Sequence, residues 1–360
     1  MLTQTPAQTS PSAPSLRPVS GPSAWIGEDL LRSEAWIYTL TAAEVAEMEA
    51  AADAMPAAGA EWIGMGRGQF PLPSLGPVLE GMRSELLHGR GFVLMRGLPV
   101  EGYSIERAAA IFWGIGAHFG KARSQNGKGH LLGHVRDLDF DLTEPTVRVY
   151  QTRERQTYHT DSCDIVALMC LQTAKQGGLS SLASSMTVYN EMLARHPDLL
   201  PCLFEPMAVD RREEVPDGHK PYFTTPVYHE HEGHLSAIYA RRYIESAQRF
   251  PDAPRLTARH REAMDLLDAL AEDERLHLDM ELRRGDMQWV HNHTVFHDRT
   301  AYEDWPQPER KRHLLRLWLC PPDGRPLPSD YADRYGGVEI GNRGGIVVPG
   351  MDFTVPLTPQ

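Results

Sequence analysis

RHLLRLWL, residues 312–319, is an apolar stretch that carries two arginines, and it is one of a series of short apolar stretches. In an extended strand, alternate side chains point to opposite faces. Arg312, Leu314, Arg316 and Trp318 therefore share one face, and positions 313, 315, 317 and 319 share the other. Because guanidinium groups are costly to bury alone, the first face reaches solvent, pairs with acidic side chains or holds an anion.

The other short stretches decide the fold class. Strands are expected at 146–152, 164–174, 179–185, 226–240, 276–282 and 287–293, between turn residues. The strict alternation of 276–282, followed by RRGD (283–286), predicts a hairpin with the next strand. Helices are expected only at 187–196 and 257–273 in this part of the chain. Many short strands favour a β-barrel or a double-sheet jelly roll, so we expect a mainly β fold with flanking helices.

The chain divides by composition. Residues 1–23 are rich in Pro, Ser and Thr and are expected to form a disordered tail. Residues 24–145 are mixed α/β, with helices expected at 41–55, 75–89 and 104–120 and a strand at 91–100. Residues 146–320 hold the β-rich core, and 321–360 form a C-terminal extension. We treat 24–360 as one domain.

Charge and cysteine content limit the partners. The net charge of −12 disfavours nucleic acid, because that affinity depends on Lys and Arg neutralising phosphates, so a small-molecule partner is expected. The four cysteines are too scattered for a disulfide framework and are expected to be free thiols. We see neither a membrane-spanning apolar run nor a signal peptide, and we expect a cytoplasmic protein without a membrane partner. The oligomeric state stays open, and a homo-oligomer is compatible with the sequence.

A metal site is indicated by TYHTDSCD, residues 157–164, in which His159, Asp161 and Cys163 occupy alternate positions. Residues two apart on a strand lie roughly 6.6 Å from each other on one face. An imidazole and a carboxylate at that spacing can both reach one ion at about 2.0–2.2 Å. Cys163 fits better as a small core residue. A third ligand is needed.

Two histidine clusters compete to supply it. HEHEGH holds His229, His231 and His234, but Glu232-Gly233 also makes this segment a good exposed hairpin. HNHTVFHDRT holds His291, His293 and His297. Spacing alone does not choose among these histidines. Motifs for serine hydrolases, P-loop nucleotide sites and dinucleotide sites do not follow any expected strand.

Taken together, these motifs resemble the taurine dioxygenase-like family of Fe(II)- and 2-oxoglutarate-dependent oxygenases. The resemblance is carried by His159-Thr160-Asp161, GGLSSLASS (177–185), HDRTAYEDWP (297–306) and RHLLRLWL, in that order, with GFVLMRGLPV (91–100) extending it. It implies a double-stranded β-helix, which is a jelly roll wrapped by helices. It also implies that 2-oxoglutarate is converted to succinate and CO2 while O2 oxidises a small, carboxylate- or amino-acid-like substrate.

The resemblance assigns roles residue by residue. It makes His159, Asp161 and His297 the iron ligands, which leaves positions open for a keto acid and O2. Arg312 corresponds to the arginine that holds the distal carboxylate of 2-oxoglutarate, and Ser180 adds a hydroxyl there. Arg316 corresponds to an arginine that meets either the cosubstrate or an anionic substrate group. Because related halogenases leave the position of Asp161 free for halide, a halogenase is not expected.

Two other functions stay open at this stage. One is a cupin-like metalloprotein, an isomerase or hydrolase that uses no keto acid. The other is a non-catalytic binding module that keeps the fold. The inward-facing Arg312 argues against the first, and an intact set of three ligands argues against the second. Neither the identity of the substrate nor the outcome of its oxidation follows from the sequence.

Overall fold

Strand β17 (His313–Cys320), which contains most of the RHLLRLWL stretch, lies inside the larger of two facing sheets. A computed structural model of the chain describes residues 16–144 and 146–360. In it, β17 pairs antiparallel with β6 (Ile165–Gln172), β3 (Lys121–Arg123) and β4 (Leu132–Val135). Leu315, Leu317 and Leu319 face a helix-covered core, whereas Leu314 and Trp318 face the interior between the sheets. The predicted division of this strand into two faces is confirmed.

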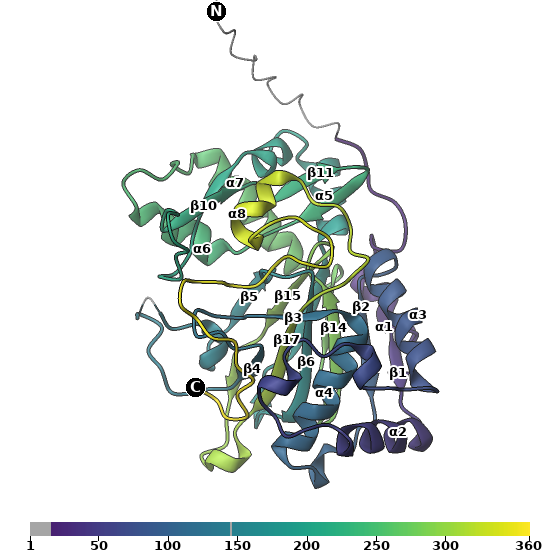
Figure 1. Cartoon of the computed structure of the whole chain (residues 1–360). Helices are drawn as coiled ribbons and strands as arrows, with labels where there is room; N and C mark the ends of the chain where they lie inside the picture. The colour runs from purple at the N-terminus through teal and green to yellow at the C-terminus, as the bar shows by residue number, and fades with distance from the viewer. Residues whose placement is uncertain (1–15, 145) are drawn as a thin grey trace, which may run out of the picture.

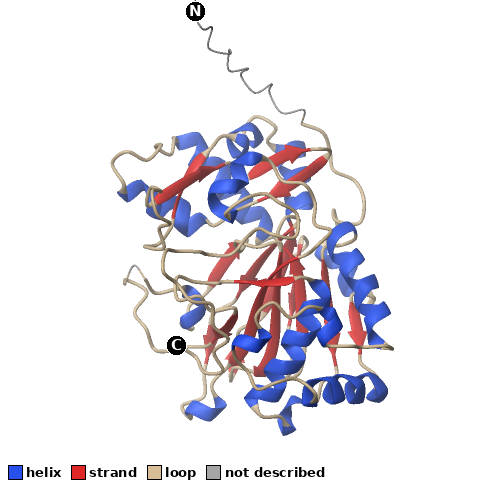
Figure 2. Cartoon of the chain, in the orientation of Figure 1, coloured by secondary structure: helices blue, strands red, loops and turns tan. Residues whose placement is uncertain are grey.

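The two sheets form a jelly roll. The larger has the strand order β1-β2-β14-β6-β17-β3, with β4 also on β17, and the smaller has the order β13-β8-β15-β5. Their other members are β1 (Ile37–Thr39), β2 (Phe92–Arg96), β14 (Met287–His291), β13 (His277–Met280), β8 (Ser180–Ser184), β15 (Val295–Arg299) and β5 (Gln156–His159). Figure 2 shows these strands in the middle of the molecule, with helices around them. The expected mainly β fold with flanking helices is therefore present.

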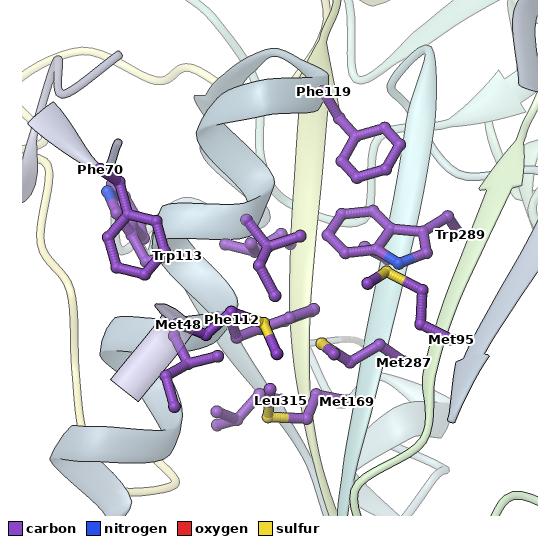
Figure 3. Packing of buried hydrophobic residues seen from close by; sticks show 14 of the residues in the cluster. Met48, Phe70, Met95, Phe112, Trp113, Phe119, Met169, Met287, Trp289 and Leu315 are labelled. Atoms are coloured by element: carbon purple, nitrogen blue, oxygen red, sulfur yellow. The ribbon is translucent and has the colours of Figure 1, made fainter. Parts of the chain in front are cut away.

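Helices cover the outer face of the larger sheet. They are α2 (Ala42–Asp53), α3 (Leu75–His88) and α4 (Ile105–Phe119), each within two residues of its predicted range. Thr41 caps α2 through the backbone N–H of Glu44, as its place before an Ala- and Glu-rich run predicts. In Figure 3, Trp289 of β14 lies against Phe119, with Phe112 also close by; the Phe119 ring is stacked at a centroid distance of 4.2 Å. This aromatic cluster packs α4 against the sheet and stabilises the contact between them.

A second layer covers the smaller sheet and forms the upper part of Figure 1. It contains α5 (Ser185–Arg195), α6 (Arg241–Ser246), α7 (Ala258–Ala271), β9 (Met207–Asp210), β10 (Tyr222–Thr225), β11 (Tyr228–His231) and β12 (His234–Ala237). The pair β11–β12 turns at Glu232 and Gly233, which confirms the expected hairpin. Shorter elements are α1 (Gly27–Leu31), β7 (Gln176–Gly177), β16 (Tyr302–Glu303) and α8 (Ala332–Tyr335).

The predicted hairpin across residues 276–293 is wrong. β13 pairs with β8 in the smaller sheet, whereas β14 pairs with β2 and β6 in the larger one. The RRGD turn therefore carries the chain from one sheet to the other. Its Asp286 is fully buried and accepts hydrogen bonds from Arg96 at 2.8–3.2 Å, and Gly285 takes a φ of +84° against the backbone of Leu98. Alternation did not distinguish the two arrangements, because both sheets bury one face in the same interior.

The predicted strand at 146–152 is also wrong. Residues Val149–Gln151 form a 3-10 turn, in which Gln151 Oε1 accepts from the Arg148 backbone and Thr152 Oγ1 donates to the Val149 carbonyl. Such local side-chain bonds compete with a strand ladder. The turn places Tyr150 against Arg316, in the wall of the site described below.

The expected tail of residues 1–23 divides in two. Residues 1–15 lie outside the described residues. Residues 16–23 run along α5, where the Val19 backbone exchanges two hydrogen bonds of 2.8 Å with Asn190. Leu16 and Val19 pack against the buried hydrophobic cluster that includes Tyr189 and Met192 of α5. This part of the expected tail is ordered, because Leu16, Val19 and the side-chain amide of Asn190 hold it to the domain. Within the described part of the chain, we find no helix with the length and apolar character needed to cross a membrane.

Candidate functional site

The side chains of His159, Asp161 and His297 lie close together at the smaller sheet of the jelly roll. His159 is the last residue of β5 and lies opposite His297 of β15 in the antiparallel register. Asp161 follows two residues after His159, beyond the end of the strand. The expectation that the strand continues through Asp161 is therefore wrong, although the carboxylate still faces both histidines. His159 Nε2 lies 3.8 Å from Asp161 Oδ1, and His297 Nε2 lies 3.7 Å from Asp161 Oδ2.

These atoms fit the requirements of one metal ion. The three side chains each offer one ligand atom within 4.8 Å of the other two. Ligands at 2.0–2.2 Å from a shared ion lie about 3 to 4.4 Å apart, so the measured separations leave room for it. His159 Nδ1 contacts the Thr157 carbonyl at 2.8 Å, a bond that presents Nε2 as the ligand nitrogen. The Gln156 amide also lies 2.8 Å from His159 Nε2 and must move aside for an ion.

Neighbouring groups hold Asp161 ionised and in place. Trp318 Nε1 donates to Oδ2 at 2.9 Å, and the backbone N–H of Asp161 donates to Asn292 at 3.0 Å. Burial alone would raise the pKa of Asp161, but Arg316 and the histidines bring it below its ordinary value. Burial lowers the pKa of His159 to about 3, with His297 adding to the effect. The site therefore presents an anionic carboxylate beside a neutral imidazole, the states that ligate metal ions.

Arg312 lies at the inner end of the site. It is 4% exposed, its Nη2 donates to the Gly178 carbonyl at 3.5 Å, and its Nη1 is buried without a partner among the described residues. Gly178 has a φ of +70°, and a Cβ there would lie 3.0 Å from Arg312 Nε, so this close approach requires glycine. Ser180 and Arg312 line one small cavity, and the Ser180 hydroxyl donates to Gln288 Oε1 at 3.0 Å.

Arg316 occupies the position between the inner and outer parts of the site. Its Nε donates to Gln125 at 2.7 Å, and its Nη1 lies 3.9 Å from Asp161 Oδ2. Its guanidinium carbon lies 4.4 Å from the centroid of Tyr150 and 5.1 Å from that of Trp318. Both arginines of the RHLLRLWL stretch therefore lie on one face, as its alternation predicts, and the structure shows that this face points inward.

Two cavities adjoin the three side chains. The inner cavity, of about 50 Å³, is lined by Ser180, His297, Arg299 and Arg312. The outer cavity, of about 710 Å³, extends to the second layer of the fold and to the C-terminal segment. His159, Asp161 and Arg316 line both. One centre is thus accessible from two sides.

The remaining candidate histidines lie elsewhere. His293 is fully buried and contacts Asp164 at 2.8 Å, and His291 contacts Thr294 at 3.1 Å. His229 is buried beside Tyr331, whereas His231 and His234 lie on the β11–β12 hairpin. Cys163 is fully buried, with the pKa of its thiol raised well above its usual value by burial, which agrees with a core residue rather than a ligand.

Several residues of the site were not predicted from the sequence. Arg299 lines the inner cavity beside Arg312, and burial lowers its pKa to about 10. Its place in the HDRT motif was the available signal. The alternation of RHLLRLWL placed Trp318 on the correct face, but it gave no indication of the hydrogen bond from Trp318 to Asp161. Arg334 and residues 344–347 bring the C-terminal extension into the wall of the outer cavity, and no pattern in that segment indicates it.

Comparisons with known proteins agree with this geometry. The model of the family described as "Taurine catabolism dioxygenase TauD, TfdA family" matches residues 51–318. FR-33289 synthase of Streptomyces rubellomurinus (strain ATCC 31215) is 32% identical over 332 residues, which cover 90% of this chain and 96% of that protein. Taurine hydroxylase-like protein SAT17 of Stachybotrys chartarum (strain CBS 109288 / IBT 7711) is 30% identical over 317 residues, 83% of this chain and 81% of that protein.

A solved structure shares the fold. The asparagine oxygenase crystallised with Fe(II), 2S,3S-3-hydroxyasparagine and succinate aligns with a TM-score of 0.60 at 19% identity, covering 79% of this chain and 93% of that one. The two alternative functions, a metalloprotein without a keto acid and a non-catalytic module, are set aside. The chain belongs to the TauD/TfdA family: it is a dioxygenase with a double-stranded β-helix fold that uses Fe(II), 2-oxoglutarate and O2 to oxidise a small molecule.

Proposed function

We propose that His159, Asp161 and His297 bind the Fe(II), and that a small carboxylate- or amino-acid-like substrate fills the outer cavity. The observation that carries this proposal is that the inner and outer cavities share His159, Asp161 and Arg316 in their walls. Oxidation of one small molecule at the expense of another requires such a centre, with one compartment for each reactant.

The inner compartment suits 2-oxoglutarate. We assign its distal carboxylate to Arg312, whose buried Nη1 lacks a partner among the described residues. A guanidinium holds a carboxylate through two parallel hydrogen bonds, and burial strengthens such a pair. Arg299 adds a second positive charge to the same cavity. Ser180 is assigned a supporting hydrogen bond, for which its hydroxyl must turn from Gln288 toward the cosubstrate.

The outer compartment suits the substrate, and we assign Arg316 to it. The Arg316 guanidinium lies between Tyr150 and Trp318, which fixes its direction, and Gln125 occupies its Nε. Arg316 lines both cavities, and its Nη1 lies 3.9 Å from Asp161 Oδ2. An anionic substrate group bound there would hold the rest of the molecule near the three ligands.

The bound Fe(II) and 2-oxoglutarate supply the oxidising chemistry, with release of succinate and CO2. The residues of the chain bind and orient. Trp318 donates to the Asp161 carboxylate, Asn292 accepts from the Asp161 backbone N–H, and Thr157 sets the tautomer of His159. Apolar side chains of the interior between the sheets, such as Val166, form part of the inner cavity wall. Ionic contacts beside such apolar surface are stronger than in open water.

Titration without oxygen tests this proposal. We expect a weak visible charge-transfer band only when both Fe(II) and 2-oxoglutarate have been added, and succinate release once O2 and a substrate from a panel of small acids and amino acids are present. Substitution of Asp161 by Ala should remove the band. Correctly folded wild-type protein that gives no band, or a folded Asp161→Ala variant that keeps it, would contradict the assignment.

We also propose that residues 24–360 act as one catalytic domain in a reducing compartment such as the cytoplasm. The domain proposal is supported by β1–β4, which come from the N-terminal part and join the same sheet as β17. The compartment is supported by the cysteines at 163, 170, 202 and 320, which are all free and buried. An oxidising compartment usually favours disulfides. Fractionation of the producing cells tests the location.

A further inference from the structure

The far wall of the outer cavity holds two arginines beside one tyrosine. Arg148 precedes the 149–151 turn, Arg212 lies in the loop after β9, and Tyr243 belongs to α6. The guanidinium carbons of Arg148 and Arg212 each lie 5.7 Å from the centroid of the Tyr243 ring. Arg148 also donates to the backbone carbonyl of Arg212 at 3.3 Å. All three line the cavity that His159 and Asp161 border.

Most acidic side chains of this cavity, outside the metal site, are already neutralised. Glu214 pairs with Arg148, Asp333 with Arg211, Glu245 with Arg241, and Asp210 with Arg249. Within residues 16–144 and 146–360, four other arginines of the wall have no carboxylate within 4.0 Å: Arg123, Arg212, Arg242 and Arg334. The cavity therefore carries surplus positive charge in a protein whose net charge is −12. Such a surplus favours an anionic ligand.

Of these four arginines, Arg212 gives the clearest indication of a bound anion. It is only 9% exposed, and its Nε is buried without a partner among the described residues, as is Nη1 of Arg148. A buried guanidinium without an acidic partner is costly unless a ligand supplies the charge. Arg212 and Glu213 also have φ values of 55° and 67°, which are uncommon for residues other than glycine. The bond from the Arg212 N–H to Asp210 Oδ1, at 2.8 Å, holds this turn and keeps the cation in the wall.

We propose that Arg148, Arg212 and Tyr243 form a subsite for a doubly charged phosphoryl group, a phosphate ester or a phosphonate, at the end of the substrate remote from the carbon that is oxidised. One guanidinium fork can hold two oxygens of a carboxylate or of a phosphoryl group, but only the phosphoryl group has a third charged oxygen for a second donor. Arg212 supplies the charge without an acidic partner, and Arg148, whose Nη2 pairs with Glu214, supplies the second donor. Tyr150 lies beside the Arg316 guanidinium and lines the same cavity as Arg148, so the subsite continues from the metal centre along one wall. The inference rests on the proposed function in placing the substrate in this cavity.

Calorimetry with small probes tests the subsite on the full chain loaded with Fe(II) and 2-oxoglutarate without oxygen. Methylphosphonate and methanesulfonate have nearly the same shape, but at pH 8 the first carries the larger charge. We expect methylphosphonate to bind at least about 10-fold more tightly. Methyl phosphate, measured in parallel, distinguishes an ester from a phosphonate as the preferred source. Equal affinity for methylphosphonate and methanesulfonate would overturn the phosphoryl assignment.

Matched variants locate the binding. Arg212→Gln should weaken methylphosphonate binding by at least about 10-fold. Arg212→Lys, which keeps the charge without the fork, should fall between that variant and the wild type. Arg242→Gln removes the same charge from an exposed position, where the side chain donates to the Leu142 carbonyl, and should change affinity by less than about 3-fold. Equal losses in the Arg212→Gln and Arg242→Gln variants would indicate general attraction and overturn the subsite.

The same samples separate this inference from the proposed function. Repeating the titration without Fe(II) and 2-oxoglutarate should leave methylphosphonate binding within about 3-fold, because the subsite is made by the protein alone. If the charge-transfer band forms and methylphosphonate does not bind, only the subsite is wrong. If methylphosphonate binds through Arg212 and the band does not form, the assignment of the metal centre fails and the anion site stands.

Discussion

Two histidine–aspartate pairs come from the same two short segments of this chain and serve different purposes. Asp161 and Asp164 lie three residues apart, and His293 and His297 lie four apart. His293 contacts Asp164 directly, at 2.8 Å, and Arg343 pairs with the same carboxylate at 2.7–3.2 Å. His297, by contrast, stops 3.7 Å short of Asp161, and the nearest arginine nitrogen, on Arg316, is 3.9 Å away.

The two aspartates differ in how far the protein itself satisfies their charge. Burial opposes the ionisation of Asp164, but His293 and Arg343 lower its pKa to about 2, so this carboxylate is already neutralised by the protein. Both side chains of the pair are at most 1% exposed. Asp161 receives one hydrogen bond, from Trp318, and borders two cavities. The unsatisfied carboxylate, rather than the count of nearby histidines, marks the site that needs a cation.

The largest effect is expected from removal of a proposed metal ligand. Substitution of Asp161 or His297 by Ala should lower succinate release by more than about 100-fold, which exceeds the 10- to 100-fold typical of outer partners, because the ion loses a direct ligand. His231→Ala, on the exposed hairpin, should retain wild-type turnover. Iron content and succinate are the measurements. A folded His293→Ala variant without iron, beside a His297→Ala variant that keeps it, would reverse our assignment.

Removing the charge of the structural pair should affect folding instead. Asp164→Asn leaves Arg343 buried without its carboxylate, which should lower the free energy of unfolding by about 3–5 kcal/mol. Urea unfolding measures this. Asp330→Asn, at an exposed position, should stay within about 0.5 kcal/mol of the wild type. The folded fraction of Asp164→Asn should still bind Fe(II); loss of iron without loss of stability would mean that the two pairs are not separate.

A third prediction concerns Arg312, the arginine of the inner cavity assigned to 2-oxoglutarate. Arg312→Ala should weaken 2-oxoglutarate binding by roughly 30- to 5,000-fold, because loss of one partner of a desolvated charge pair costs about 2–5 kcal/mol. Arg312→Lys should recover only part of this, since a point charge lacks the bidentate fork. Calorimetry on the Fe(II) protein without oxygen measures both. Arg310→Ala, an exposed arginine stacked on Trp305, serves as the control. Unchanged affinity in Arg312→Ala would remove the cosubstrate assignment.

The smallest expected effect concerns the bond that orients Asp161. Trp318→Phe keeps an aromatic ring but cannot donate to Oδ2, and we expect Fe(II) affinity to fall by about 10- to 100-fold, as for other outer partners of metal ligands. Trp305→Phe, outside both cavities, should leave the affinity unchanged. If Fe(II) binds equally well to the Trp318→Phe variant, the carboxylate does not need this bond to hold its direction.

Local patterns predicted most of the elements. Helices α2, α3, α4 and α7 lie where periodicity and caps placed them, and the alternation of RHLLRLWL assigned Arg312 and Arg316 to one shared face, which is the inner face in the structure. These features depend on neighbours within a few residues, so a sequence window contains the needed information. The strand predicted at 146–152 failed because side-chain bonds to the backbone formed a turn, and the hairpin at 276–293 failed because two sheets accept the same alternation.

Local spacing alone showed that a histidine and a carboxylate two positions apart required a third ligand to form a metal site, and that two arginines share one face of an apolar strand. Only the tertiary structure decided which histidine faces which carboxylate. The register of β15 on β5 sets His297 opposite His159, across 138 positions (297 − 159), and the C-terminal extension brings Arg343 to Asp164 and Arg334 to the cavity wall. Such contacts depend on how separate elements pack against each other, because hydrogen bonds and ion pairs act over a few ångströms in space at any separation along the chain.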